Sequence, residues 1–228
     1  MNTRKKYLLW LNVLLLLITG ISSCDSDDDM TGTEDNDSTF HVKYYDQDPD
    51  LYKRQGYWYR DSFIEMTPQK ESPYTLLVIW DSNKGKKALD YIVRENAGVV
   101  IDGYQIGSTG TNAALIRCQK YFTCPYLFVS SSYKTTQLYH DDDYIRVSCR
   151  ISVAMKSGKN PEVIEYDYAE ILKLDREQYK AHPNWTPIFN CKLNTSCEVL
   201  QLAEEINSRD DVEWAEAEMF VPAHLATQ

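Results

Sequence analysis

The strongest constraint on the fold is a rhythm of short apolar runs and amphipathic segments that occurs twice. In the first series, Tyr74–Trp80 is a continuous run of β-branched and aromatic residues, typical of a buried strand, and residues 86–95 have helical apolar spacing. In the second series, residues 145–155 alternate as a long strand, and residues 166–178 and 197–207 have helical spacing. Each series runs strand, helix, strand, strand, connection, strand. We therefore predict an α+β fold of two successive split β-α-β (ferredoxin-like) sandwiches with antiparallel sheets.

The remaining elements complete the two series. Further strands are expected at residues 56–59, 62–66, 98–101, 113–117, 125–131, 188–193 and 212–221, and residues 134–137 are expected to form a loop. The predicted domains are an N-terminal α+β domain at 40–140 and a C-terminal α+β domain at 141–228.

Charge excludes one class of function. The chain has 228 residues with a net charge of −10. The first 23 residues hold three cations and no acid, so the remaining 205 carry 21 cations against 34 acids, a net charge of −13. Such a chain has no basic excess with which to neutralise phosphates, so we do not expect it to bind nucleic acid.

The N-terminus has the form of a bacterial export signal. Residues 1–6 are cationic, and the apolar run at 7–21 is shorter than the roughly 20 residues that span a membrane. The run ends in small residues followed by Cys24, which resembles the lipobox of bacterial lipoproteins. The resemblance implies a signal peptide at 1–23 and a lipid anchor on Cys24. The alternatives are an ordinary secretory signal with a chance cysteine, or an uncleaved anchor.

An acidic cluster follows the cysteine directly. It consists of Asp25, Asp27, Asp28 and Asp29. The cluster resembles the export tag of Bacteroidetes lipoproteins that face the cell exterior from the outer membrane, and that is the location we expect. The alternative is a plain solvated tether. Residues 24–39 are polar, acidic and without periodicity, so we predict a disordered tether there.

The other five cysteines carry no recognisable motif. They are Cys118, Cys124, Cys149, Cys191 and Cys197. Two pairs have five residues between them, a spacing too wide for the tight pairs of a zinc site. An odd number leaves at least one thiol unpaired in a monomer, and the sequence does not determine the pairing. Cys149 lies in an apolar strand and is expected to be a small buried hydrophobe.

Other chemistry-bearing patterns are weak. The glycines at 103–110 are too widely spaced for a nucleotide loop, so we expect turns and no cofactor. The aspartates at 141–143 lack the rest of a calcium loop, and a solvated loop with no metal is favoured. The aromatic residues at 57–59 could stack on a glycan, although packing within a hairpin is the simpler interpretation.

The end of the chain resembles a known family. Residues 194–220 (NTSCEVLQLAEEINSRDDVEWAEAEMF) are similar to the closing helix and strand of the fervidolysin-type N-terminal prodomain of subtilisin-like serine proteases. The positions that fit the family's strand are Val212, Ala215, Glu216 and Phe220. Ala217 replaces a proline, and the phenylalanine comes one residue late. A looser likeness to Bacteroidetes lipoproteins that carry this prodomain extends over most of residues 52–221.

The resemblance implies a protein-binding role without catalysis. No catalytic-triad motif of a subtilisin-like protease occurs in the sequence, so we expect a prodomain-like module and not an enzyme. In the family, such domains dock on a protease through the outer sheet face and place the tail in its cleft. The residues that would meet the partner are Glu216, Glu218, Phe220, Val221 and Pro222. The alternative function is a cell-surface adhesion or glycan-binding lipoprotein with no protease link.

Overall fold

A computed structural model describes residues 40–49, 56–59, 62–70, 72–106, 111–135 and 144–220. The chain divides into a unit of residues 1–36 and a compact unit of residues 37–228. The described residues do not include the predicted signal peptide, the tether at 24–39 with Cys24 and the acidic cluster, or the domain boundary at residue 140. Where described, the chain is an α+β fold with antiparallel sheets, as predicted.

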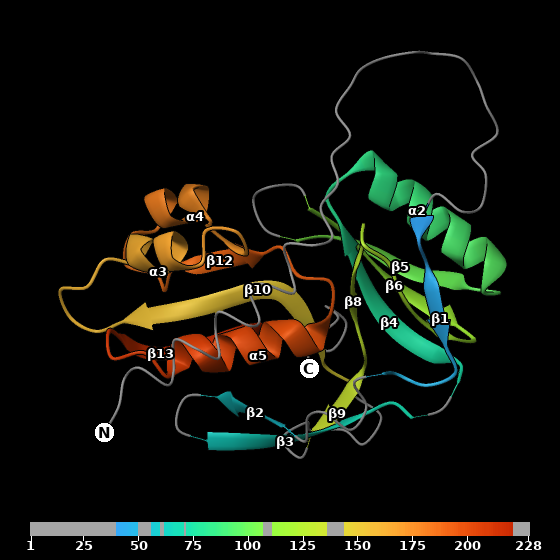
Figure 1. Ribbon diagram of the computed structural model, residues 1–228, viewed down its shortest axis with the longest axis horizontal. Coiled ribbons are helices and arrows are strands. Elements are labelled where there is room, and N and C mark those ends of the chain that lie inside the picture. The colour runs from blue at the N-terminus through green and yellow to red at the C-terminus, as the bar shows by residue number, and fades with distance from the viewer. Residues whose placement is uncertain are drawn as a thin grey trace, which may run out of the picture. The chain divides into compact units, whose positions relative to one another are not determined.

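The first four-stranded sheet has the order β5-β6-β4-β8, with antiparallel neighbours throughout (Figure 1). Its strands are β4 (Tyr74–Trp80), β5 (Val99–Ile106), β6 (Thr111–Cys118) and β8 (Phe128–Ser130). Helix α2 (Asn83–Glu95) connects β4 to β5 and packs on one face of the sheet. Strand β4 is central and buried on both faces, which explains why Thr75 is its only polar residue.

Local chemistry sets the start and the inner face of α2. The Ser82 side chain caps the helix by accepting a hydrogen bond from the Gly85 backbone N–H at 3.1 Å. A Cβ at Gly85 would lie 2.8 Å from the Trp80 Cβ and from the Tyr126 carbonyl oxygen, so the close approach of this first turn requires glycine. Ala88, Leu89 and Ile92 are fully buried one and two turns later.

Short strands form two smaller sheets. β1 (Lys43–Tyr45) pairs with β7 (Tyr121–Thr123), and the hairpin of β2 (Gly56–Tyr59) and β3 (Ser62–Pro68) adds β9 (Tyr133–Thr135). Residues 134 and 135 belong to β9, so the loop predicted at 134–137 is wrong for its first two residues. The pairing of β9 with β3 is a long-range contact that the local sequence does not reveal.

The second four-stranded sheet has the order β11-β12-β10-β13, again antiparallel throughout. Its strands are β10 (Arg146–Met155), β11 (Leu172–Leu174), β12 (Ile188–Cys191) and β13 (Val212–Phe220). If each sheet's strands are numbered along the chain, both sheets have the order 2-3-1-4. The repeat that the sequence suggested as a rhythm is thus present as a repeat of strand order.

Three helices belong to the second series: α3 (Glu162–Asp167), α4 (Arg176–Ala181) and α5 (Ser196–Asn207). The single helix predicted at 166–178 is wrong, because this segment ends α3, forms β11 and begins α4. Its leucines at 172 and 174 are buried on either side of an exposed lysine, which is a strand pattern. Pairing with β12 decides between the two interpretations.

Local side chains set the start of α5. Thr195 and Glu198 form a reciprocal capping box at its N-terminus. Helix α5 lies beside β10 and β13 (Figure 1), and one of its faces is buried in the same core cluster as those strands. The buried residues of that face are Val199, Leu200, Leu202, Ala203 and Ile206.

Two hydrophobic clusters form the core. Leu76 and Val78 of β4 belong to the cluster beneath α2. Leu77 and Ile79, on the opposite face, belong to a larger cluster that includes Ile151 of β10 and the apolar face of α5. The larger cluster therefore contains described residues of both predicted domains.

Hydrogen bonds also join the two series of strands. The Val147 backbone N–H donates to the Ser130 hydroxyl at 2.9 Å, and Tyr133 exchanges two backbone hydrogen bonds with Ile145. The Tyr133 and Ser196 hydroxyl groups are 2.8 Å apart. Within the described residues, no helix has the length and apolar character needed to cross a membrane.

Candidate functional site

The predicted partner-binding residues are split by the limits of the described structure. Glu216, Glu218 and Phe220 lie on β13, whereas Val221 and Pro222 lie outside the described residues. Ala215 and Ala217 are buried in the core, so Glu216 and Glu218 occupy the opposite sheet face.

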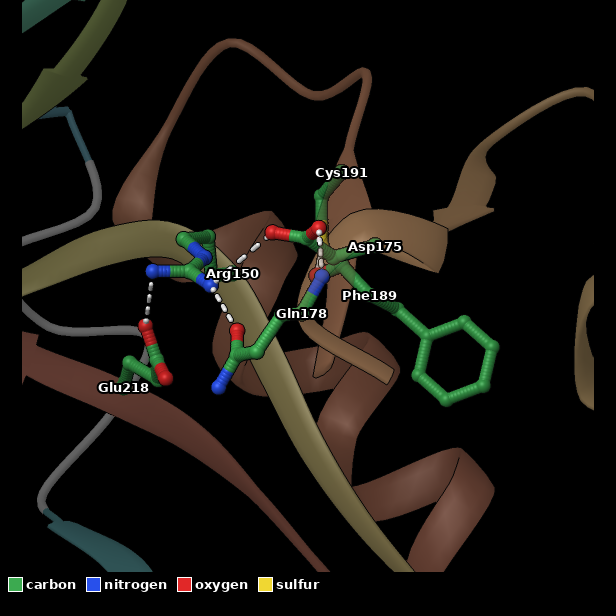
Figure 2. A network of polar contacts seen from close by, with 6 residues as sticks. All are labelled: Arg150, Asp175, Gln178, Phe189, Cys191 and Glu218. Atoms are coloured by element: carbon green, nitrogen blue, oxygen red, sulfur yellow. Dashed lines mark hydrogen bonds and ion pairs between the residues drawn. The ribbon is translucent and has the colours of Figure 1, made fainter. Parts of the chain in front are cut away.

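Glu218 belongs to a polar network centred on Arg150 of β10 (Figure 2). One guanidinium nitrogen, Nη1, lies 3.3 Å from Glu218 Oε2. The other, Nη2, donates to Gln178 Oε1 at 2.9 Å and lies 3.4 Å from Asp175 Oδ2. The Arg150 and Asp175 side chains are 10% and 1% exposed, so this is a buried ion pair with a second, more accessible acid beside it.

Helix α4 is held in place by the same network. Asp175 is its N-cap, and the Asp175 Oδ1 accepts a hydrogen bond from the Gln178 backbone N–H at 3.1 Å. The other Asp175 oxygen and the Gln178 side chain both face Arg150 (Figure 2). Arg150 therefore joins a strand, a helix start and the neighbouring strand β13.

Burial and the charge of Arg150 act in opposite directions on the pKa of Glu218. Removal from water raises the pKa of the Glu218 carboxyl, while Arg150 and a hydrogen bond from Ser152 lower it, and the net direction is upward. Two acids share one guanidinium here, and the Arg150 Nε has no hydrogen-bond partner among the described residues. The guanidinium therefore fixes the positions of both acids and neutralises part of their charge.

A polar row crosses the outer face of the second sheet. Lys173 of β11 is opposite Asn190 of β12, and Asn190 is opposite Arg150 of β10. The ion pair between Arg150 and Glu218 extends the row to β13. The row therefore spans all four strands on the face opposite the hydrophobic core.

A groove of about 540 Å³ lies beside this row. Its walls come from the end of β4, the start of α2, residues 125–128, and residues 190–194 at the end of β12. The two sides are joined by a hydrogen bond of 2.8 Å from the Val129 N–H to the Asn194 carbonyl. Asn190 and Lys173 line the groove as well as belonging to the polar row.

The groove combines aromatic and polar side chains. Trp80 and Tyr126 line it, and the Lys84 ammonium lies 4.2 Å from the centre of the Tyr126 ring. Asp81 and Asn194 add hydrogen-bonding groups. Such a lining suits a small polar ligand with an apolar face.

The cysteines divide between the two clusters. Cys118 and Cys124 are buried beneath α2, and burial raises the pKa of Cys118 to about 12. Cys149 and Cys191 both line the groove as free thiols. Burial raises the pKa of Cys149 to about 11, so only a small fraction is thiolate at neutral pH.

Several candidates from the sequence remain untested. The side chains at 57–59 and the aspartates at 141–143 lie outside the described structure. Among the residues that the structure describes, no three metal-binding side chains converge. Sequence reasoning missed Arg150, Asp175 and Gln178 as a group, although the arginine at position 150 in the middle of the strand predicted at 145–155 was a signal of a special environment.

Comparison of the chain with protein-family models, with curated proteins and with solved structures finds no match.

Proposed function

We propose that this protein is a non-catalytic lipoprotein, anchored through Cys24 in the outer membrane and facing the cell exterior, whose folded part binds another protein. A subtilisin-like protease is the first partner to test, with inhibition or folding assistance as the role. The signal sequence and acidic cluster support the location. The binding proposal rests on the outer polar face of the second sheet, where Ser152, Glu216 and Glu218 are half-buried.

Strand order supports the likeness to a prodomain. The order β11-β12-β10-β13, with α3 after β10 and α5 before β13, is the order expected of a split β-α-β sandwich and supports that proposal for the second sheet. In such a sandwich the helices cover one sheet face and leave the other for a partner. Here the apolar faces of the helices pack in the core cluster, and the polar row lies on the other side.

The position of β13 supports a role for the tail. β13 pairs with β10 in antiparallel fashion along its whole length, with two irregularities in register. At one end Val212 is opposite Met155, and at the other Phe220 is opposite Arg146. Arg150 also contacts the Glu218 side chain. A strand held along its length would present residues 221–228 from a fixed point, as binding in a protease cleft requires.

Inhibition of a subtilisin-like protease by the purified chain tests the proposal. Ser152, half-buried on the outer face opposite Glu216, is the position to perturb. Ser152→Arg should weaken inhibition at least tenfold, whereas Asp90→Arg on the exposed side of α2 should not. Deletion of residues 221–228 should also weaken inhibition. If the intact chain inhibits no co-expressed subtilisin-like protease, the protease partner is refuted.

The groove favours a second candidate, glycan binding by a surface adhesion protein. Trp80 and Tyr126 offer aromatic surface beside the amides of Asn190 and Asn194, a combination that suits a sugar ring. Titration with a panel of oligosaccharides tests this function. Tyr126→Ala should abolish binding, and Tyr166→Ala, which removes a side chain that is 84% exposed outside the groove, should preserve it.

A further inference from the structure

The pairing of β10 with β12 brings two cysteines together. Arg150 is opposite Asn190, and Ile151 is opposite Phe189. Continuing this register by one residue, still within both strands, would place Cys149 opposite Cys191. Burial and the charge of Cys149 raise the pKa of Cys191, so the two side chains lie close together. The two thiols are 42 positions apart in the sequence and neighbours in the sheet.

Both side chains are on the same face. Ile151 and Phe189 are fully buried in the larger core cluster, and residues two positions away on a strand share its face. Cys191 is a member of that cluster, and Cys149 packs against it. Both also line the groove, so the pair lies where the core meets an open space.

Directly opposite residues of an antiparallel pair have Cα atoms about 4.5–5.5 Å apart. A disulfide spans Cα separations of about 4.4–6.8 Å. A bond between these two cysteines therefore requires side-chain rotation and no movement of the strands. The other cysteines are placed differently: Cys118 and Cys124 belong to the second cluster, and Cys197 lies on α5.

We propose that Cys149 and Cys191 form a disulfide bond across β10 and β12, made by exchange with a disulfide-bearing oxidant. The Cys149 thiolate attacks one sulfur of the oxidant, forms a mixed disulfide and releases one thiol. The Cys191 thiolate then attacks the Cys149 sulfur and releases the second thiol. Two protein thiols are oxidised and one oxidant disulfide is reduced to two thiols, with the protons of both cysteines passing to the released thiols.

Cys149 is the entering thiol because it is the more accessible of the two. Cys149 is half-buried, whereas Cys191 is 9% exposed. Since burial raises the pKa of Cys149 to about 11, the thiolate fraction rises about tenfold per pH unit below that value. The first step should therefore be about 100-fold faster at pH 9 than at pH 7. The proposal does not depend on the proposed function, although an exported chain would meet such an oxidant.

Peptide mapping of the full-length chain tests the bond. The folded protein is incubated with oxidised glutathione, quenched in acid, alkylated with N-ethylmaleimide in denaturant and digested with trypsin. Cleavage after Arg146, Arg150, Lys180 and Lys192 releases peptides 147–150 and 181–192, each with one of the two cysteines. We expect these peptides to be linked in the oxidised sample and separate after reduction.

Cysteine variants and the wild-type chain test the proposed bond independently. Cys197→Ser should leave the linked pair unchanged, and Cys149→Ser should leave Cys191 alkylated. If both peptides are recovered alkylated after oxidation of a wild-type chain that circular dichroism shows to be folded, the proposal is overturned. A link from Cys191 to Cys197, or to any other cysteine, overturns it equally. The wild-type result needs no variant to fold.

Discussion

Replacing Arg150 by alanine should destabilise the protein strongly, because the substitution leaves a buried acid without its cation. Asp175 is 1% exposed and faces the guanidinium at 3.4 Å, and Gln178 would lose its 2.9 Å hydrogen bond. Removing one partner of a buried ion pair costs about 3–5 kcal/mol. Glu218 is 27% exposed and can recover water, so we expect the low end, about 3 kcal/mol.

Urea unfolding followed by tryptophan fluorescence measures this loss. Arg176→Ala is the matched control, because Arg176 also pairs with acids but its side chain is 47% exposed, so its loss should be far smaller. Glu218→Gln should cost little at pH 7, since burial raises the pKa of Glu218 and disfavours its charge. A loss below about 1 kcal/mol for Arg150→Ala would refute the view that the network stabilises the sheet.

The other predictions concern the core, the anchor and pH. Leu202→Ala, at a site 7% exposed, should lower the free energy of unfolding by about 2–5 kcal/mol in the same urea assay. Cys24→Ala should abolish incorporation of a clickable palmitate while leaving circular dichroism unchanged. Alanines in place of the three aspartates at 27–29 should leave the protein lipidated but protected from protease added to intact cells. A hydrogen bond from Arg176 lowers the pKa of the Glu165 carboxyl. The stability that ionised Glu165 contributes is therefore present at neutral pH and lost as the pH falls through its folded pKa. The difference in free energy of unfolding between wild type and Glu165→Gln should shrink from pH 7 to pH 3.

Much of the secondary structure was predictable because its causes are local. The run Tyr74–Trp80 has no polar residue apart from Thr75 and forms the strand that is buried on both faces. Residues 197–207 combine helical apolar spacing with a capping box just before them, and α5 forms there. Each of these segments carries its own signal, in period or in end chemistry.

The segment at 166–178 shows where local signals fail. The segment has so few apolar residues that their spacing fits a helical period as well as a strand period. Pairing of Leu172 and Leu174 with β12 decides for a strand. The sequence also determined that Glu216 and Glu218 share a face, because alternation along a strand is a local property.

The groups that could carry function were decided by the tertiary structure. Arg150, Asp175 and Glu218 come from three elements, and only the strand order puts two acids beside one guanidinium. Cys149 and Cys191 become neighbours only through the register of β10 and β12. The physical reason is the same in both cases: period and capping act within a few residues, whereas ion pairs and disulfides depend on which distant strands hydrogen-bond and in which register.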